Sequence, residues 1–338
     1  MEKRKLGLTG PEVGEIGLGC MGMSDFYGPA DRAECIATIH AALSSGATLI
    51  DTGDFYGQGH NEMLIAEALR GLKREDYVLS VKFGALRDPA AGFIGYDARP
   101  PAVRNFLAYS LKRLNVDYID IYRPARLDPN VPIEETVGAI ADMVKAGYVR
   151  AIGLSEVGAA TIRRAAAVHP ISDLQIEYSL IVRMIEAEIL PTCRELGIGI
   201  TAYAVLARGL ISGHWTKERS SGRDFRVQSS RFAGDNLEHN LALVEALRKA
   251  AAARGASVAA TAVAWVLAQG GDIVPLVGAR KRAQWAESSA AASLKLSAAD
   301  LAAIEMAAPN GAAKGERYPA QAMRRWTARG GPERRRPT

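Results

Sequence analysis

The sequence predicts a (β/α)₈ TIM barrel of the α/β class over residues 1–323, with an N-terminal β-hairpin closing the barrel bottom. Short apolar runs typical of strands alternate with helical patterns from residue 32 onward, which indicates eight strand–helix units. Neither a linker nor a break in composition divides the 338 residues. A doubly wound sheet would need fewer units in each domain and a linker between domains, so one barrel is the better interpretation.

Each element can be justified in order along the chain. Residues 4–18 are rich in Gly, Val and Ile and are expected to form the hairpin. Asp31 is a suitable N-cap for a helix that runs through Ser45, and Gly46 would end it. Ser297 would cap the last helix. Strands are expected at residues 47–51, 77–82, 117–122, 149–154, 174–178, 198–203, 273–277 and 292–296, and helices at 61–72, 101–114, 134–146, 158–168, 239–254, 257–269 and 280–290.

The formal charge of +5 is concentrated near the end of the chain. Residues 311–338 hold eight Lys or Arg and two Glu, so the remainder carries a net charge of −1. A terminal cluster of Arg can bind nucleic acid, but no recognisable nucleic-acid-binding module accompanies this one. Residues 324–338 are therefore expected to be a basic, flexible tail, without a nucleic-acid partner.

The three cysteines, Cys20, Cys35 and Cys193, are scattered and lack the spacing of metal ligands. They are expected to be reduced thiols in the core of a cytoplasmic protein, and no metal site is expected. Apolar runs stay well short of the ~20 residues that cross a bilayer, and the N-terminus lacks the apolar stretch of a secretion signal. No membrane partner is expected.

A carboxylate, a phenol and an amine follow two neighbouring strands. Asp51 closes the strand at 47–51, Tyr56 lies just beyond it, and Lys82 closes the next strand. An ammonium beside a phenol favours the phenolate, so the pKa of Tyr56 is expected to fall from ~10, while the carboxylate keeps the ammonium charged. These residues therefore predict a catalytic acid, Tyr56, whose pKa is shifted toward the working pH. The alternative is an exposed Tyr, an exposed Lys and a helix-capping Asp.

Other polar or aromatic groups also stand at predicted strand ends, where barrels of this class place their chemistry. Ser155 and Glu156 follow the strand at 149–154, Gln175 lies in the next strand, Tyr203 ends the strand at 198–203, and Gly278 follows the strand at 273–277. These side chains are expected to line one opening of the barrel, at the carboxyl ends of its strands, which we call the mouth. The polar residues 207–238, which contain several glycines, are the candidate lid loop.

With these motifs in place, the chain resembles the aldo-keto reductase superfamily over residues 3–325. Each motif alone is weak, and their order and spacing make the resemblance specific. The matching pieces are Gly17-Leu-Gly-Cys-Met-Gly22, Ile50-Asp-Thr-Gly-Asp-Phe-Tyr-Gly57, Asn61-Glu62, Lys82, Gly153-Leu-Ser-Glu156, Gln175, Tyr203, Gly209-Leu-Ile-Ser-Gly213 and Val277-Gly-Ala-Arg280.

The resemblance implies reversible NADPH-dependent reduction of aldehyde or ketone carbonyls, on a barrel without a Rossmann domain. Tyr56 would be the proton donor, Lys82 its partner and Asp51 the anchor of Lys82. The resemblance also implies cofactor contacts at Gly19, Cys20, Met21, Ser155, Glu156, Gln175, Tyr203, Ala204, Leu206, Gly209, Gly278, Arg280, Gln284, Glu287 and Ser288. The 2′-phosphate of NADPH would bind near Arg280, Lys281 and Arg282.

The chain departs from the family pattern after the strand at 117–122. The family usually has Tyr-x-Gln-His-Arg there, and in this chain Ala125 stands at the His position. A neutral His polarises and orients the carbonyl, which Ala cannot do. Elsewhere Glu156 replaces the common Asn, and Ala204-Val205 replaces Ser-Pro.

Several substitutes for the missing His stay open, namely His60, Arg123, Arg126 or no residue at all. Two functions stay open with them. One is a working reductase for a small carbonyl compound, and the other is a nucleotide-holding regulatory or sensor protein on the same scaffold, with slow or no turnover. The sequence names neither the substrate nor an oligomeric partner.

Overall fold

The predicted barrel is confirmed by the structure, a computed structural model that describes residues 1–216, 224, 226 and 229–318. Within these residues, eight parallel strands close into a barrel, in chain order around its circumference. The strands are β3 (Gly17–Gly19), β4 (Leu49–Gly53), β5 (Val78–Phe83), β8 (Ile119–Pro124), β9 (Val149–Ser155), β10 (Ile171–Glu177), β11 (Gly199–Tyr203) and β12 (Ile273–Gly278), and β12 pairs with β3 to close the ring.

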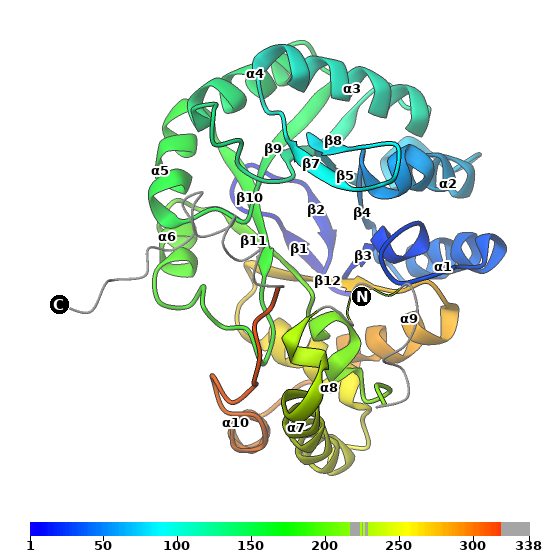
Figure 1. Cartoon of the computed structure of the whole chain (residues 1–338), viewed down its shortest axis with the longest axis vertical. Helices are drawn as coiled ribbons and strands as arrows, with labels where there is room; N and C mark the ends of the chain where they lie inside the picture. Colours follow the sequence, from blue (N-terminus) through cyan, green and yellow to red (C-terminus); the bar gives the residue numbers. More distant parts are fainter. Residues whose placement is uncertain (217–223, 225, 227–228, 319–338) are drawn as a thin grey trace.

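Helices surround the strands (Figure 1). Their apolar faces and the outward faces of the strands form the larger hydrophobic cluster of the protein. The helices are α1 (Arg32–Ser44), α2 (His60–Ala68), α3 (Pro100–Leu114), α4 (Ile133–Lys145), α5 (Ala159–Val168), α6 (Ile189–Glu195), α7 (Gly234–Ala252), α8 (Val258–Ala268), α9 (Arg282–Ser289) and α10 (Ala298–Ala307). Two predicted caps are confirmed, since Asp31 accepts a hydrogen bond from the Glu34 amide and Ser297 forms a capping box with Asp300.

The predicted N-terminal hairpin is present and closes the bottom of the barrel. It consists of β1 (Lys3–Lys5) and β2 (Glu12–Gly14), which pair antiparallel. Leu6 and Val13 are buried in a second apolar cluster with Leu49 and other residues of the barrel strands. The positive φ of Gly7 (64°) lets the backbone approach β10, because a Cβ there would lie 2.3 Å from the Ser172 carbonyl oxygen.

Two strand assignments from the sequence are wrong. The hairpin ends at Gly14 rather than residue 18, and Gly17–Gly19 is the first strand of the barrel. No strand forms at residues 292–296, because Ala290–Ser293 is a 3₁₀ helix. Leu294 and Leu296 instead pack against the outer core. The alternation of Leu294 and Leu296 with polar residues is the pattern expected of a strand. The real strand at Gly17–Gly19 is too short and glycine-rich to show such a pattern.

Two elements that the sequence did not predict lie between predicted ones. A hairpin of β6 (Ala85–Arg87) and β7 (Phe93–Tyr96) follows β5 directly, and α6 connects β10 to β11. The candidate lid at 207–238 contains a 3₁₀ segment, Ala207–Ser212, another at Ser230–Phe232, and the start of α7. Residues 217–223, 225 and 227–228 of that lid lie outside the described residues, as does the predicted basic tail at 324–338.

The three cysteines are buried and unbonded to one another, as expected of core thiols. In the described residues, no helix is both long and apolar enough to cross a membrane.

Candidate active site

The predicted mouth forms where the carboxyl ends of the parallel strands meet. Lys82 on β5 lies in register with Gly53 on β4 and with Arg123 on β8. On the opposite wall, Gln175 on β10 pairs with Ser155 on β9. Parallel pairing thus brings these groups to one end of the barrel, although they are far apart in the sequence.

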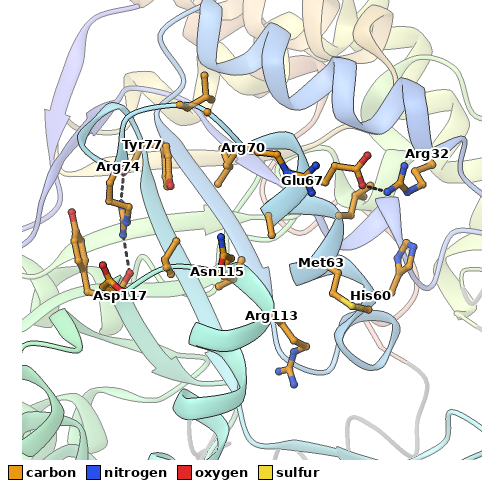
Figure 2. A pocket seen from close by; sticks show the side chains of 18 residues that line it. Arg32, His60, Met63, Glu67, Arg70, Arg74, Tyr77, Arg113, Asn115 and Asp117 are labelled. Carbon is orange, nitrogen blue, oxygen red and sulfur yellow. Dashed lines mark hydrogen bonds and ion pairs between the residues drawn. The ribbon is translucent and has the colours of Figure 1, made fainter.

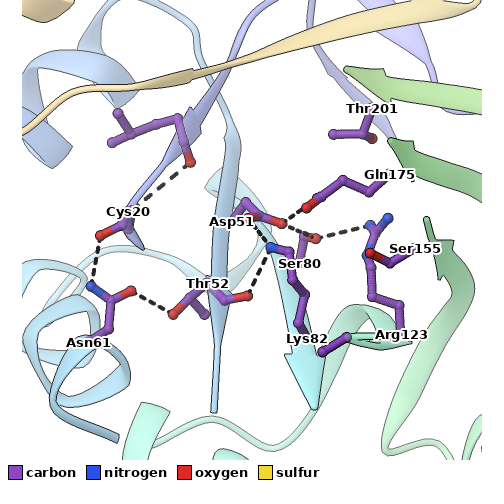
Figure 3. A network of polar contacts seen from close by, with 12 residues as sticks. Cys20, Asp51, Thr52, Asn61, Ser80, Lys82, Arg123, Ser155, Gln175 and Thr201 are labelled. Carbon is purple, nitrogen blue, oxygen red and sulfur yellow. Dashed lines mark hydrogen bonds and ion pairs between the residues drawn. The ribbon is translucent and has the colours of Figure 1, made fainter. Parts of the chain in front are cut away.

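Asp51 is the centre of a buried polar network (Figure 3). One carboxylate oxygen accepts a hydrogen bond from Lys82 Nζ, and the two groups form an ion pair. The other oxygen accepts from Ser80 Oγ at 2.8 Å and from Gln175 Nε2 at 2.7 Å. Asp51 is 2% exposed and Lys82 is 5% exposed, so the pair is shielded from solvent. Burial is the main cause that lowers the pKa of Lys82, and Asp51 opposes it.

Tyr56 lies in the first turn after β4, with its ring buried beside Lys82. Lys82 Nζ is 5.3 Å from the ring centroid. Among the described residues, no hydrogen bond joins Nζ to the phenol oxygen. Besides Asp51, Nζ contacts the Thr52 carbonyl at 3.4 Å. Burial, followed by Asp51, raises the pKa of Tyr56 well above its usual value. The expected fall of this pKa below its usual value is therefore wrong, because desolvation of the phenolate and the charge of Asp51 outweigh the lowering effect of Arg126.

The first turn of α2 connects the Tyr56 loop to β3. Asn61 donates from Nδ2 to the Cys20 carbonyl at 2.9 Å and to Ser24 Oγ at 2.8 Å. Thr52 Oγ1 donates to the Asn61 side-chain oxygen at 2.7 Å. These hydrogen bonds link the adjacent ends of β3 and β4 to the start of α2, close to Tyr56.

The candidate substitutes for the missing His lie in three different environments. His60 is exposed, and its Nδ1 is 2.8 Å from Ser24 Oγ. It lines a surface pocket of about 740 Å³ outside the barrel, between α2 and residues 113–118 (Figure 2). Arg123 is fully buried in the barrel and forms an ion pair with Asp173. Only Arg126 stands beside the mouth, with its Nη1 atom 3.3 Å from Ser155 Oγ.

A second cluster of charges, which the sequence did not predict, forms at the ends of β9, β10 and β11. Tyr203 Oη donates to Glu156 at 2.8 Å, and Arg317 forms ion pairs with Glu156 and Glu177. Burial raises the pKa of Glu156, but Arg317 and then Arg126 outweigh it and lower this pKa to about 2. Tyr318 Oη lies 2.7 Å from Tyr203 Oη. The residues after α10 therefore contribute to the mouth.

Aromatic side chains from the loops after β3 and β4 lie beside Tyr56, and one from the unpredicted β6–β7 hairpin packs against them. The Phe55 ring is 4.7 Å and the Phe26 ring 6.4 Å from the Tyr56 ring, both edge-on. Phe93 on β7 stacks on Phe26 at 6.0 Å. In the sequence, these aromatic residues appear only as single residues between predicted elements, so the cluster around Tyr56 was not predicted.

The residues expected to contact the cofactor lie at strand ends or around α9. Gly19 ends β3 and pairs with Gly278 at the end of β12, and Cys20 and Met21 follow β3. Ala204 and Leu206 precede the 3₁₀ segment that contains Gly209. Around α9, Gln284 Oε1 accepts from the Arg280 amide at 3.2 Å, Glu287 pairs with His214, and Ser288 is buried.

The cationic stretch before α9 is partly engaged in other contacts. Arg282 forms an ion pair with Glu34 at 2.9 Å, and its amide donates to the same carboxylate. Arg280 Nη1 donates to three carbonyls of residues 27–29, at 2.9 to 3.1 Å. Lys281 is exposed. Of the three cations, Arg280 and Lys281 are thus not paired with a carboxylate in the described residues.

Comparison with known proteins agrees with this geometry. The model of the aldo/keto reductase family matches residues 15–308. A curated relative from Glycine max, "Probable aldo-keto reductase 1", is 43% identical over 317 residues, which cover 93% of this chain and 91% of the relative.

Solved structures of similar fold include the glycerol dehydrogenase AKR11B4 from Gluconobacter oxydans. It has a TM-score of 0.82 and 29% identity, over 90% of this chain and 94% of that one. The holo form of the aldo-keto reductase AKR11C1 from Bacillus halodurans has a TM-score of 0.76 and 27% identity, over 91% and 96% of the two chains. Because the family model and the Glycine max relative both span most of the sequence, the chain belongs to the aldo/keto reductase family, oxidoreductases that reduce small-molecule carbonyls with a nicotinamide cofactor.

Proposed function

We propose that this protein reduces aldehyde or ketone carbonyls to alcohols, reversibly and with NADPH, and that Tyr56 donates the proton. The observation that carries the proposal is the buried Lys82–Asp51 ion pair beside the Tyr56 ring. A buried ion pair is expensive to maintain, and its position at the catalytic end of a barrel favours a chemical role over a purely structural one.

The raised pKa of Tyr56 suits a proton donor. At neutral pH the phenol holds its proton, which is the state needed to protonate a carbonyl oxygen as it becomes an alkoxide. When the proton leaves, negative charge forms on the phenol oxygen, and the ammonium of Lys82 favours that charge. Asp51, held by Ser80 and Gln175, would keep the ammonium in place.

The residues around β12 and β11 fit a nicotinamide dinucleotide. A Cβ at Gly278 would meet no atom within 4 Å, so the end of β12 leaves room beside Gly19 for a ligand. Ala204, Ala207 and Arg208 have positive φ values of 52°, 47° and 60°, and such unusual backbone conformations are concentrated at functional sites. When bound, NADPH would supply the hydride that the carbonyl carbon receives. We propose the fifteen cofactor residues named from the resemblance, from Gly19 to Ser288, as the binding set.

We further propose a preference for NADPH over NADH. Arg280 and Lys281 lie just before α9, where a 2′-phosphate would meet both the cations and the N-terminal amides of the helix. Arg282 contributes less to this preference, because Glu34 already neutralises it.

The competing function is a nucleotide-holding sensor, which the Ala at position 125 favours because a poorly polarised carbonyl would react slowly. A screen of NADPH consumption over a panel of aldehydes and ketones separates the two functions. We expect many turnovers per protein molecule with at least one carbonyl. Oxidation of one NADPH equivalent and no more, across the panel, would instead indicate the sensor.

A further inference from the structure

The position that usually holds a carbonyl-polarising His has no polar side chain in this protein. Ala125 is 2% exposed, and its amide is used in a hydrogen bond to the Phe83 carbonyl at 2.8 Å. Its methyl group cannot donate a hydrogen bond to a substrate. If the carbonyl oxygen is polarised by a residue besides Tyr56, another side chain at the mouth must act.

Arg126, the next residue, is held in a defined orientation beside the mouth. Nη1 donates to the Ala125 carbonyl at 2.6 Å and to Ser155 Oγ at 3.3 Å. Nη2 donates to Tyr318 Oη at 3.3 Å. A guanidinium has five N–H donors. In the described part of the chain, these contacts use three of them, which leaves Nε–H and one Nη2–H for a ligand.

The direction of the hydrogen bonds around Tyr318 supports this orientation. Tyr203 Oη donates its single proton to Glu156, so the hydrogen bond between the two phenols must be donated by Tyr318. Tyr318 then has only acceptor sites left for Arg126 Nη2. A one-way series of donors therefore runs from Arg126 through Tyr318 and Tyr203 to a buried carboxylate, and it fixes the guanidinium plane.

The other candidates are occupied elsewhere. His60 lines the outer surface pocket and contacts Ser24. Arg123 donates to both oxygens of Asp173, at 2.9 and 3.2 Å, and both side chains have no exposed surface. Arg126 is also close enough to Tyr56 to be the strongest influence that lowers the pKa of this phenol, against the larger effect of burial.

We propose that Arg126 takes the role of the missing His, by donating a charge-assisted hydrogen bond to the carbonyl oxygen while Tyr56 protonates it. The inference rests on the proposed reductase function. As a hydride from NADPH reaches the carbonyl carbon, the π electron pair moves onto oxygen, and the phenol proton of Tyr56 completes the alcohol. A guanidinium that is already oriented stabilises that developing charge more strongly than a neutral imidazole would.

The test compares Arg126→Met with wild type in the full chain, using NADPH and an uncharged aromatic aldehyde. We expect kcat to fall by roughly 10²–10³, the usual effect of losing one oxyanion donor, with NADPH affinity by fluorescence titration unchanged within about twofold. Arg126→Lys keeps the cation and should recover much of the loss. Arg104→Met, which removes an exposed Arg paired with Asp142 on the outer helices, is the control and should match wild type.

A second measurement reports on chemistry rather than structure. A guanidinium stays protonated up to a pH of ~12, so the ratio of wild-type to Arg126→Met kcat should stay constant from about pH 6 to 9. In Ala125→His/Arg126→Met, an imidazole would replace the guanidinium, and any recovered activity should follow the titration of that imidazole near pH ~6.5.

Each other outcome overturns the inference in a distinguishable way. Wild-type turnover together with an Arg126→Met kcat within about threefold would leave the reductase function intact and remove the role of Arg126. A defect confined to the KM of a carboxylate-bearing aldehyde would make Arg126 a substrate anchor instead. Absence of wild-type turnover would overturn the reductase function itself. If Arg126→Met does not fold, Arg126→Gln is judged by the same criteria.

Discussion

Asp54 and Tyr56 lie on the same turn after β4, and burial is the main cause that raises the pKa of both side chains. For Tyr56 the raised pKa favours the protonated phenol, which is the state that the proposed proton donor requires. For Asp54, burial and the nearby Glu62 raise the pKa to about 8. One oxygen of Asp54 accepts the Gly84 amide at 3.2 Å, and the other is buried without a hydrogen-bond partner. This environment therefore favours the neutral carboxylic acid form of Asp54.

Tyr56→Phe removes the proposed proton donor and keeps the ring in its aromatic surroundings. We expect turnover to fall by roughly 10²–10⁴ with little change in stability or NADPH affinity. Steady-state rates and cofactor titration, measured separately, check this expectation. A variant that turns over at the wild-type rate would show that another group supplies the proton.

Asp54→Asn tests the neutral carboxyl through the pH dependence of stability. The pKa of Asp54 is about 8 in the folded protein, whereas the unfolded chain releases this proton near the ordinary aspartate pKa of 3.8. Between these values the folded state binds more protons, so wild-type stability should fall as pH rises. Asn cannot ionise, and we expect the variant to lose that slope and to gain on the order of a few kcal/mol over wild type by pH ~9.

Urea unfolding of both proteins at about pH 5, 7 and 9 measures this difference. Asp117→Asn, at an exposed position, is the matched control and should keep the wild-type slope. Parallel slopes for wild type and Asp54→Asn would mean that Asp54 is ionised in the folded protein.

At the scale of elements, we propose that the segment before α9 sets the preference for NADPH over NADH. Arg280→Met removes the cation that we propose for the 2′-phosphate, and one such contact is worth about 1.5–3 kcal/mol, or roughly ten- to a hundredfold. We expect the kcat/KM ratio of NADPH to NADH to fall by that factor. The ratio is informative because loosening of residues 27–29, which Arg280 also contacts, would affect both cofactors alike. Arg282→Met, which breaks only the ion pair with Glu34, should change the ratio much less.

The N-terminal hairpin supports the barrel through buried apolar side chains, among them Leu6. Leu6 is fully buried against the interior barrel residues, whereas Leu8, two residues later, is 73% exposed. Leu6→Ala should lower the free energy of unfolding by about 2–5 kcal/mol, through lost burial and a residual cavity. Leu8→Ala should change it by no more than about 0.5 kcal/mol. Denaturant unfolding compares the pair, and equal effects would contradict a plugging role for the hairpin.

At the scale of the whole molecule, a polar network runs through the barrel interior beneath the mouth. Arg123 donates to Ser80 Oγ at 3.0 Å, so the buried Arg123–Asp173 pair is connected through Ser80 to Asp51. Thr201 Oγ1 also donates to Asp173, at 2.5 Å. The network joins β4, β5, β8, β10 and β11, which makes the position of the Asp51–Lys82 pair a property of the closed barrel.

Asp173→Asn would leave the Arg123 charge buried without compensation. We expect a loss of about 3–5 kcal/mol in the free energy of unfolding, measured by denaturant titration. Adding Arg123→Met should recover part of that loss, because the uncompensated charge is then gone. Asp142→Asn, in an exposed pair with Arg104, should cost no more than about 1 kcal/mol. A double variant that is less stable than Asp173→Asn would argue against this account.

The sequence determined the barrel, the caps at Asp31 and Ser297, and the order of groups around the mouth. Local patterns suffice for these features, since helix periodicity, capping residues and the polar ends of apolar runs are all read within a few positions. The same patterns misassigned two segments. Gly17–Gly19 was missed because a three-residue strand is too short to show a periodic pattern. Residues 292–296 were assigned to a strand because Leu294-Lys295-Leu296 alternates apolar and polar residues as a strand does.

Only the tertiary structure decided the ionisation of Tyr56 and the neighbours of Ala125. The pKa of Tyr56 depends on how much water the fold removes, and no local pattern reports that desolvation. The contacts of Arg126 with Ser155 and Tyr318 span 29 and 192 residues of sequence. Such contacts exist only because closing the barrel brings the ends of β8 and β9 together with the segment after α10.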